Sequence, residues 1–204
     1  MDFCLHFKVG WNLSIVILGD ESQCGSYLLR IRLTRDVKLV FGGFKKGKLI
    51  SMPMGDYIYV GSANSKRGAS SLGRRVVRHA TRSGRKWSHP IREVMVRRFK
   101  ESEVGEGDLL PQREKRLRWN VDHLLDLSSA DLAAVYILRS EQPQEKALVE
   151  FIEADPGSVI VEQGLGANDN PGHTHLLRIH SEECWWRGLR DRLGEQFNLK
   201  IRVR

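Results

Sequence analysis

The stretch Gly55-Asp56-Tyr57-Ile58-Tyr59-Val60-Gly61-Ser62-Ala63 decides the fold of this chain. Its aromatic and β-branched residues are typical of a strand, and the small residues at its end are typical of a tight turn. Many arginines follow between positions 67 and 82. A strand end, small residues and a basic helix together allow a phosphate group to approach closely. Alternatively, the stretch is an ordinary turn and the arginines form a solvated face.

Strand-like segments separated by glycine-containing turns fill the first half of the chain. They cover residues 13–18, 27–33, 37–41, 48–52 and 57–60. Gly42-Gly43 and residues 45–47 supply turn signals between them. The pattern predicts a meander or a set of hairpins.

The hydrophobic period becomes helical from Ala69 onward. Apolar residues gather on one side of the helical projection, namely Leu72, Val76, Val77 and Ala80. Arginines occupy the other side, namely Arg74, Arg75, Arg78 and Arg82. This segment is therefore expected to form a helix with one buried face and one basic face.

Further elements are expected downstream. Helices are predicted at 89–100, 119–127, 143–153 and within 182–204, and strands at 132–138 and 174–179. The fold class is therefore α/β of the α+β type, a small antiparallel sheet flanked by helices. We expect a single domain over 1–204 with a motif-bearing core at about 25–180. A basic helical insertion is expected at about 83–117, and a C-terminal extension at 181–204.

The charge indicates a polyanionic partner. The chain has 33 Lys and Arg against 25 Asp and Glu, which gives a net charge of +8. Nucleic acid is the expected partner. A membrane is not expected, because no apolar run approaches the roughly 20 residues of a spanning helix. The N-terminus carries no export signal pattern, so cytoplasmic residence is expected, with association with the nucleoid as a further option.

Cysteines and histidines give weak metal signals. Cys4, Cys24 and Cys184 show no C-x-x-C spacing, which argues against both a disulfide framework and a zinc site. We expect reduced thiols. His173 and His175 form an H-x-H pair without a nearby cysteine, and a structural role is favoured over a metal site.

Several motifs resemble a known group of enzymes. Gly25-Ser26-Tyr27 and Tyr59-Val60-Gly61 resemble the paired signatures of the GIY-YIG nuclease superfamily, and Arg75-Val76-Val77-Arg78-His79 matches its R-x-x-R-H helix. Three further blocks resemble the DUF123 branch, namely 119–125, 164–169 and 174–176. Asn120, Asn168 and Asn170 depart from that pattern, because the branch has His, Ser and Cys there. His123 is the nearest candidate to compensate for the missing histidine.

The resemblance implies a catalytic site. By motif position its catalytic residues are Tyr27, Tyr59, Arg75 and His79, and Glu145 holds one divalent ion, Mg²⁺ or Mn²⁺. An arginine can offset the charge of a phosphodiester, a phenol can orient or deprotonate water, and a carboxylate can hold Mg²⁺. Both tyrosines could instead be half-buried strand residues. His79 lies on the border between the two helix faces, where it contacts phosphate or caps buried surface.

Glu145 has a structural alternative. If Gln142 caps the helix and Pro143 begins it, Glu145 falls at the third position, where a carboxylate can cap backbone N–H groups. Leu148 and Ile152 share its stripe, however, which places it on the inward side. A carboxylate there requires a cation or metal, so the ligand role is favoured.

The leading hypothesis is a metal-dependent endonuclease that hydrolyses phosphodiester bonds in nucleic acid, with DNA favoured. Its expected nucleic-acid-binding residues are Arg67, Arg74, Arg78, Arg82, Arg85 and Lys86. The alternative, supported by Asn120, is a catalytically silent nucleic-acid-binding module that acts with a DNA repair enzyme. A structural or protein-binding domain is the third option. Asp122 is expected to anchor Arg78 or a backbone turn rather than a metal.

Overall fold

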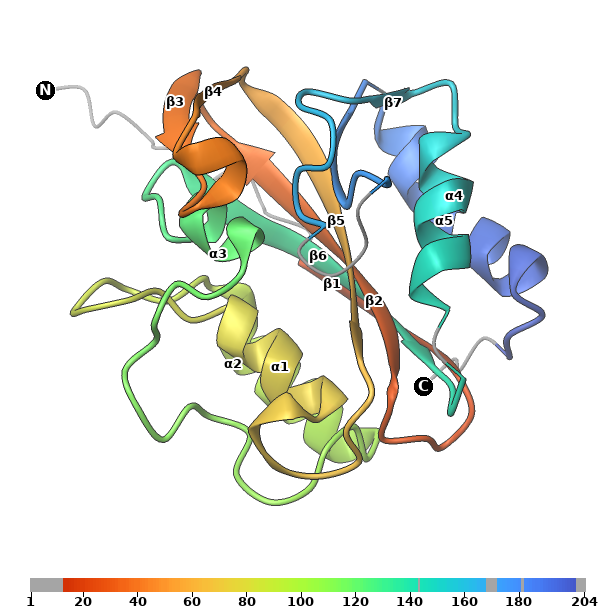
Figure 1. Cartoon of the computed structure of the whole chain (residues 1–204). Helices are drawn as coiled ribbons and strands as arrows, with labels where there is room; N and C mark the ends of the chain where they lie inside the picture. The colour runs from red at the N-terminus through yellow and green to blue at the C-terminus, as the bar shows by residue number, and fades with distance from the viewer. Residues whose placement is uncertain (1–12, 143, 168–171, 181, 201–204) are drawn as a thin grey trace, which may run out of the picture.

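A central sheet lies between two groups of helices in the computed structural model, which describes residues 13–142, 144–167, 172–180 and 182–200 (Figure 1). The sheet has six strands in the order β1-β6-β2-β5-β8-β7, and a second, two-stranded sheet contains β3 and β4. Helices α1, α2 and α3 cover one face of the large sheet, and α4 and α5 cover the other (Figure 1). The predicted fold class is therefore confirmed.

The centre of the sheet is β2 (Gly25–Leu33), which pairs antiparallel with both β5 (Gly55–Ala63) and β6 (Ala130–Arg139). Beyond β5 follow β8 (Leu176–Ile179) and the short β7 (Ser158–Val159), also antiparallel. Successive side chains alternate between the two faces. Tyr27 and Tyr59 therefore share one face, called here the tyrosine face.

The expected meander is wrong at β1 (Ser14–Gly19), which pairs in parallel with β6 instead of forming a hairpin with β2. The cause lies in Arg139, a buried residue at the end of β6. Its guanidinium donates hydrogen bonds to the carbonyls of Glu21 and Ser22 in the β1–β2 connection, and to those of Ser102 and Glu103. Strand β6 thus lies between β1 and β2. The contacts of Arg139 cannot be predicted from the periodicity of the sequence.

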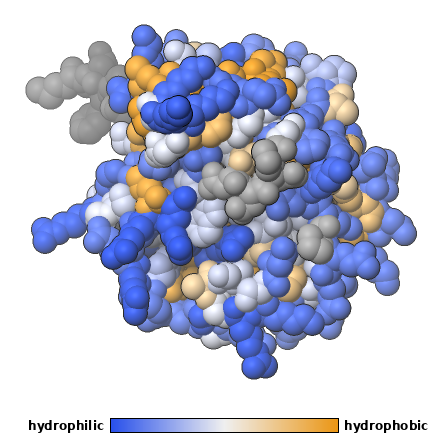
Figure 2. Space-filling model, viewed as in Figure 1, coloured by the Kyte–Doolittle hydropathy of each residue, from blue (hydrophilic) through white to orange (hydrophobic). Residues whose placement is uncertain are grey.

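The strands β3 (Val37–Val40) and β4 (Leu49–Met52) form the predicted hairpin, joined by the 3₁₀ turn η1 (Phe44–Lys46). Apolar side chains remain exposed in and beside it, among them Leu49 at 56% and Met54 at 57%. Figure 2 shows this apolar surface at the top of the molecule, whereas hydrophilic side chains dominate the lower left. The hairpin thus carries part of the exposed apolar surface of the protein.

Three helices pack on the tyrosine face: α1 (Leu72–His79), preceded by the turn η2 (Gly68–Ser70), α2 (Ile91–Glu101) and α3 (Asn120–Leu125). Each buries its apolar stripe against the sheet, as the sequence predicts for α1. In α2 the buried residues are Ile91, Met95 and Phe99. Val94 and Val96 of the same helix are only partly buried.

Helices α4 (Glu145–Glu153) and α5 (Glu183–Gln196) pack on the opposite face. The residue that precedes the first turn of α4 is Gln144, not Gln142, so Glu145 is the first helical residue and does not occupy the expected third position. Trp186 is buried and docks α5, with the Arg30 guanidinium 4.2 Å from its ring centroid. The C-terminal helix is therefore part of the body of the protein.

The described residues contain no helix that is long and apolar enough to cross a membrane. Cys24 and Cys184 are free thiols. Cys4, Pro143, Asn168 and Asn170 lie outside the described residues.

Candidate active site and basic cavity

The two motif tyrosines lie close together on neighbouring strands. Their ring centroids are 6.3 Å apart, and Tyr27 pairs across the β2–β5 ladder with Gly61. A Cβ atom on Gly61 would lie 2.6 Å from the Tyr27 hydroxyl oxygen, closer than packed atoms tolerate. The glycine of the second motif therefore makes room for the tyrosine of the first.

Tyr27, His79 and Asp122 form a hydrogen-bonded chain. The Tyr27 hydroxyl lies 3.0 Å from His79 Nε2, and His79 Nδ1 lies 3.1 Å from Asp122 Oδ1. An ionised carboxylate only accepts hydrogen bonds, so Nδ1–H donates to Asp122. For a neutral imidazole, Nε2 is then the acceptor and the Tyr27 hydroxyl is the donor.

Burial determines the protonation states of Tyr27 and His79. Burial lowers the pKa of His79, so the neutral imidazole is the resting form. Burial and the neighbouring Tyr59 raise the pKa of Tyr27 well above its ordinary value, and Arg75 offsets this only in part. The expectation that His79 lies at the border of the helix is wrong, because it is 0% exposed. It contacts Tyr27 and does not reach the surface.

Asp122 joins the tyrosine cluster to the basic segment beside it. Its carboxylate accepts from the backbone N–H groups of Arg118 and Trp119 and lies 3.0 Å from Arg78 Nη1. Lys115 Nζ, also buried, lies 3.2 Å from it. Burial alone would raise the pKa of Asp122, but the hydrogen bond from His79 and the charges of Lys115 and Arg78 hold it well below its usual range. The expected anchoring of Arg78 is confirmed.

Arg75 reaches the end of strand β5. Its Nη1 donates to the Ser62 backbone carbonyl, and its guanidinium carbon lies 5.2 Å from the Trp119 ring centroid. The same indole ring contacts the Arg78 guanidinium at 4.4 Å and the His79 ring at 5.6 Å. Trp119 thereby fixes both arginines over an aromatic surface.

Glu145 reaches the same strand end from the opposite face of the sheet. Ser62 Oγ donates to Glu145 Oε2, and His175 Nδ1 lies 3.3 Å from Oε1. Strand β8 pairs with β5 from Asp56 to Tyr59, and the Val60 N–H donates to the His175 carbonyl just beyond that ladder. Arg75 and Glu145 meet at the end of β5, one on the Ser62 carbonyl and one on its hydroxyl.

The surroundings of Glu145 favour its ionised form. Burial would raise its pKa, but hydrogen bonds from His175 and Ser62 and the charge of Arg75 lower it. Its side chain is 32% exposed, so a cation can reach it from solvent. Within the described residues no three His, Cys, Asp or Glu side chains gather into a metal cluster. One accessible carboxylate beside a hydroxyl fits Mg²⁺, which keeps several waters and takes few protein ligands.

The structure brings Tyr27, Tyr59, Arg75 and Glu145 together, with both tyrosine side chains buried. Tyr27 is 2% exposed and Tyr59 is 4% exposed, because their rings pack against α1. The accessible part of the cluster is the rim formed by Arg75 and Glu145, which are partly exposed.

The six arginines and lysines expected to bind nucleic acid take different positions. Arg67, Arg85 and Lys86 are exposed, although Lys86 is paired with Asp126. Arg82 does not lie on the basic face of α1 as the helical projection predicts: its side chain is 10% exposed and donates to the carbonyls of Trp87, Leu125 and Ala130. Arg82 lies three residues beyond α1, where the chain turns inward, so the helical projection misplaces it.

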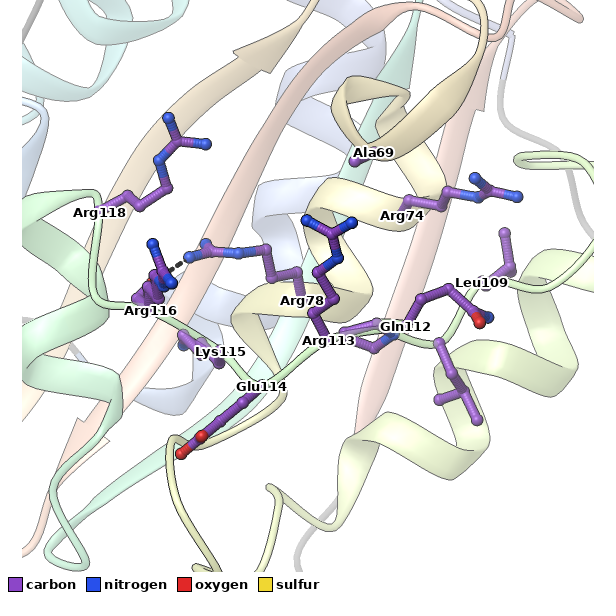
Figure 3. Close-up of a pocket in the computed structure, with 12 residues that line it drawn as sticks. Ala69, Arg74, Arg78, Leu109, Gln112, Arg113, Glu114, Lys115, Arg116 and Arg118 are labelled. Carbon is purple, nitrogen blue, oxygen red and sulfur yellow. Dashed lines mark hydrogen bonds between the residues drawn. The ribbon is translucent and has the colours of Figure 1, made fainter.

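Arg74 and Arg78 line a cavity of about 950 Å³ beside the tyrosine cluster (Figure 3). The opposite wall is the segment 109–118, whose cations are Arg113, Lys115, Arg116 and Arg118. Sequence reasoning assigned no role to these four residues. The signal was present, because four of the six residues in 113–118 are Lys or Arg.

Other contacts of the cluster also lacked a sequence signal. Ser62 and His175 hold Glu145, yet each is separated from it by tens of residues. His173 contacts a different carboxylate, Glu153, at 3.1 Å. His123 lies against Gly42 and not beside the tyrosines, so it does not replace the histidine absent at Asn120.

Comparison with known proteins gives one match. The family model described as "Domain of unknown function DUF123" matches residues 26–196, which include every residue of the cluster. Searches of the curated proteins and of the solved structures found no match. With the match covering most of its length, the chain belongs to the DUF123 family.

Proposed function

We propose that this chain is a metal-dependent endonuclease of the GIY-YIG type that hydrolyses phosphodiester bonds in nucleic acid, with DNA the favoured substrate. The observation that carries the proposal is the convergence at one end of β5 of Tyr27, Tyr59, Arg75 and Glu145. These residues come from β2, β5, α1 and α4. Convergence of two phenols, a guanidinium and a carboxylate from four elements suits a catalytic site better than a fold requirement.

Arg75 would bind the scissile phosphate. Its guanidinium is held by the Ser62 carbonyl and by the Trp119 ring, so it is oriented before substrate arrives. A fixed cation can stabilise the negative charge that develops on the phosphoryl oxygens. Glu145 accepts a hydrogen bond from the hydroxyl of Ser62, the residue whose carbonyl holds Arg75.

Tyr27 would handle the proton of the attacking water. Its raised pKa means that it does not act as a phenolate at rest. It can accept a proton from water while its own proton passes to His79 Nε2, 3.0 Å away. The resulting imidazolium would be stabilised by Asp122, to which His79 Nδ1 is bonded. Tyr59, 6.3 Å from Tyr27 between ring centroids, would orient the water or a phosphate oxygen.

Glu145 would hold the divalent ion, with Ser62 and His175 fixing its orientation. When bound, Mg²⁺ supplies positive charge to the leaving oxygen. The rest of its coordination would come from water and from the phosphate itself.

The experiment is a cleavage assay on duplex, branched and single-stranded DNA, and on RNA, with Mg²⁺, Mn²⁺ or EDTA. Glu145→Ala should abolish cleavage and leave binding intact. Glu150→Ala removes a carboxylate from the exposed side of the same helix and should cleave normally. Absence of metal-dependent cleavage of every substrate by the wild-type protein would refute the proposal.

The second candidate is a catalytically silent nucleic-acid-binding module that acts with a DNA repair enzyme. Two observations favour it: the near-complete burial of both tyrosines, and Asn120, whose buried Nδ2 has no hydrogen-bond partner in the described part of the chain. For this function, Glu145→Ala should change neither binding nor any activity of the complex. The same variant therefore separates the two candidates.

A further inference from the structure

The cavity between α1 and the segment 109–118 is strongly cationic. Six of its twelve lining residues are Lys or Arg, against one carboxylate, Glu114. Figure 3 shows Arg78 extending from α1 toward Arg116, while the Glu114 carboxylate points away from the guanidinium groups. Positive charge thus dominates the space that a ligand would enter.

These cations form two groups that differ in their partners. Arg78 and Lys115 lie deep in the wall and are both paired with Asp122. The other four are Arg74, Arg113, Arg116 and Arg118. Within the described residues, no carboxylate lies within ion-pair distance of any of these four side chains. Four neighbouring guanidinium groups without acidic partners repel one another, and a bound polyanion would remove that repulsion.

The walls of the cavity are fixed by specific contacts. Arg78 Nη2 donates to the Arg116 carbonyl, and the Arg118 N–H donates to Asp122. At the other end of α1, a Cβ on Gly73 would lie 2.5 Å from the Val104 carbonyl oxygen, so the helix and the insertion are in direct contact. The backbone that carries Arg116 and Arg118 is therefore anchored before a ligand binds, which lowers the entropy cost of binding.

The cavity adjoins the catalytic cluster. Asp122 bonds His79 on one side and Lys115 on the other, and Trp119 contacts both Arg75 and Arg78. A strand whose phosphate lies on Arg75 would therefore pass Trp119 before reaching the cavity. A volume of about 950 Å³ exceeds what a single phosphate needs and suits several linked nucleotides.

We propose that this cavity is a binding subsite for the sugar-phosphate backbone of a nucleic acid, seated on Arg74, Arg113, Arg116 and Arg118. The proposal rests on the proposed function for the direction of the strand, because it places these phosphates next to the one on Arg75. Guanidinium groups bind phosphate oxygens bidentately and read no base sequence. The subsite therefore supplies affinity and register, not sequence specificity.

The test compares two triple variants that remove the same charge. One is Arg113→Ala, Arg116→Ala and Arg118→Ala, all exposed residues of the cavity wall. The control is Arg35→Ala, Lys38→Ala and Arg187→Ala, exposed cations near the β3–β4 hairpin and on α5. A third variant replaces the three cavity arginines with lysine. Circular dichroism melts establish that each variant is folded.

Binding of a labelled 20-base-pair duplex, as DNA and as RNA, is measured by fluorescence anisotropy at several NaCl concentrations in EDTA. Each phosphate contact contributes about 0.9 to the slope of log affinity against log salt for duplex DNA. The cavity triple should therefore lose about 2 to 3 from this slope. The lysine variant should retain most of the slope, and the control triple should lose less than one contact's share. The two duplexes show which nucleic acid the subsite prefers.

A cavity triple whose slope matches that of the control would overturn the proposal, as would wild-type protein that binds neither duplex. Pyrophosphate that binds the control triple but not the cavity triple, with no effect of the cavity arginines on duplex affinity, would identify a small-anion site instead and would also overturn it. The readout is binding in EDTA. Loss of slope without any cleavage activity would therefore refute the nuclease function and leave the subsite standing.

Discussion

At single residues, the cluster shows how one side chain determines the identity of the next. Tyr27 needs an acceptor for its buried hydroxyl, and His79 provides it. His79 needs a fixed tautomer, and Asp122 provides it. Asp122 in turn needs cations, and Lys115 and Arg78 provide them. A buried polar group without a partner is costly, so changing one member exposes the others to that cost.

Gly61→Ala tests the contact beneath Tyr27. The added methyl group would lie 2.6 Å from the Tyr27 hydroxyl oxygen, so the ring must move away from His79. Overpacking of this kind costs about 1–3 kcal/mol. Urea denaturation should show that loss of unfolding free energy. Gly43→Ala is the matched control: nothing lies within 4 Å of its added Cβ, and its φ of −79° suits alanine. Equal stability of both variants would contradict the assignment.

Asp122→Asn tests the buried carboxylate. The change leaves Lys115, whose side chain is 0% exposed, without its counter-charge. Removing one partner of a buried pair costs about 3–5 kcal/mol. A calorimetric melt at pH 7 should show a large fall in Tm. Asp191→Asn, on an exposed side chain of α5, should alter stability by less than about 0.5 kcal/mol. A melt of Asp122→Asn that coincides with wild type would show that Lys115 does not depend on this carboxylate.

At the level of helices and strands, α1 is the element on which the site depends, because it carries Arg75, Arg78 and His79 and packs on both the sheet and the insertion. Gly73 allows the second contact. Gly73→Ala should cost about 1–3 kcal/mol, because its Cβ would lie 2.5 Å from the Val104 carbonyl oxygen.

The matched control for this change is Gly188→Ala in α5, where nothing lies within 4 Å of the added Cβ. There, alanine should stabilise the protein by up to about 1 kcal/mol through helix propensity alone. The two substitutions are chemically identical, so thermal melts of opposite sign would establish the helix–insertion contact. A stabilising Gly73→Ala would disprove it.

Elements with a clear period were predictable from the sequence. Strands β2 and β5 and helices α1, α2 and α5 lie where the alternation or the helical stripe placed them. The predictions failed where a distant partner decides the outcome. Strand β1 pairs with β6, whose Arg139 binds the β1–β2 connection, and Arg82 turns inward to donate to carbonyls on α3 and β6.

The candidate site was predictable to a similar extent. Motif spacing brought Tyr27, Tyr59, Arg75 and Glu145 into one hypothesis, and the structure brings these residues together. The burial of His79 and the contacts of Ser62 could not be predicted, because they depend on which residues the sheet register brings together. Periodicity in one segment carries no information about its packing partner in another.

In the molecule as a whole, the candidate site residues lie on both faces of the sheet and meet at the end of β5. The tyrosines and Arg75 lie on one face with α1, and Glu145 lies on the other with α4. They meet at Ser62, where Arg75 binds the carbonyl and Glu145 binds the hydroxyl. A single residue at the end of β5 therefore joins groups from the two faces of the sheet into one cluster.

The stability of the fold should depend on pH through His89, which lies fully buried behind α1. Its Nδ1 accepts from the Leu132 N–H, and its Nε2–H donates to the Leu125 carbonyl. Burial and the neighbouring Arg82 lower its pKa to about 3. Lys115 lowers it further, and Asp126 and the Leu125 hydrogen bond oppose the shift only in part.

The sign follows from the two states. His89 takes up a proton near pH 6.5 in the unfolded chain, whereas in the folded protein its imidazole stays neutral until about pH 3. Stability from the neutral imidazole is therefore fully present above pH 6.5 and is lost as pH falls from there toward pH 3. His89→Asn keeps an acceptor for the Leu132 N–H and cannot titrate. It should melt lower than wild type at pH 7, because the imidazole packing is lost, but its Tm should fall less steeply between pH 6.5 and pH 5.5, where ordinary carboxylates remain ionised. Parallel Tm curves for the two proteins over that interval would show that His89 does not control acid stability.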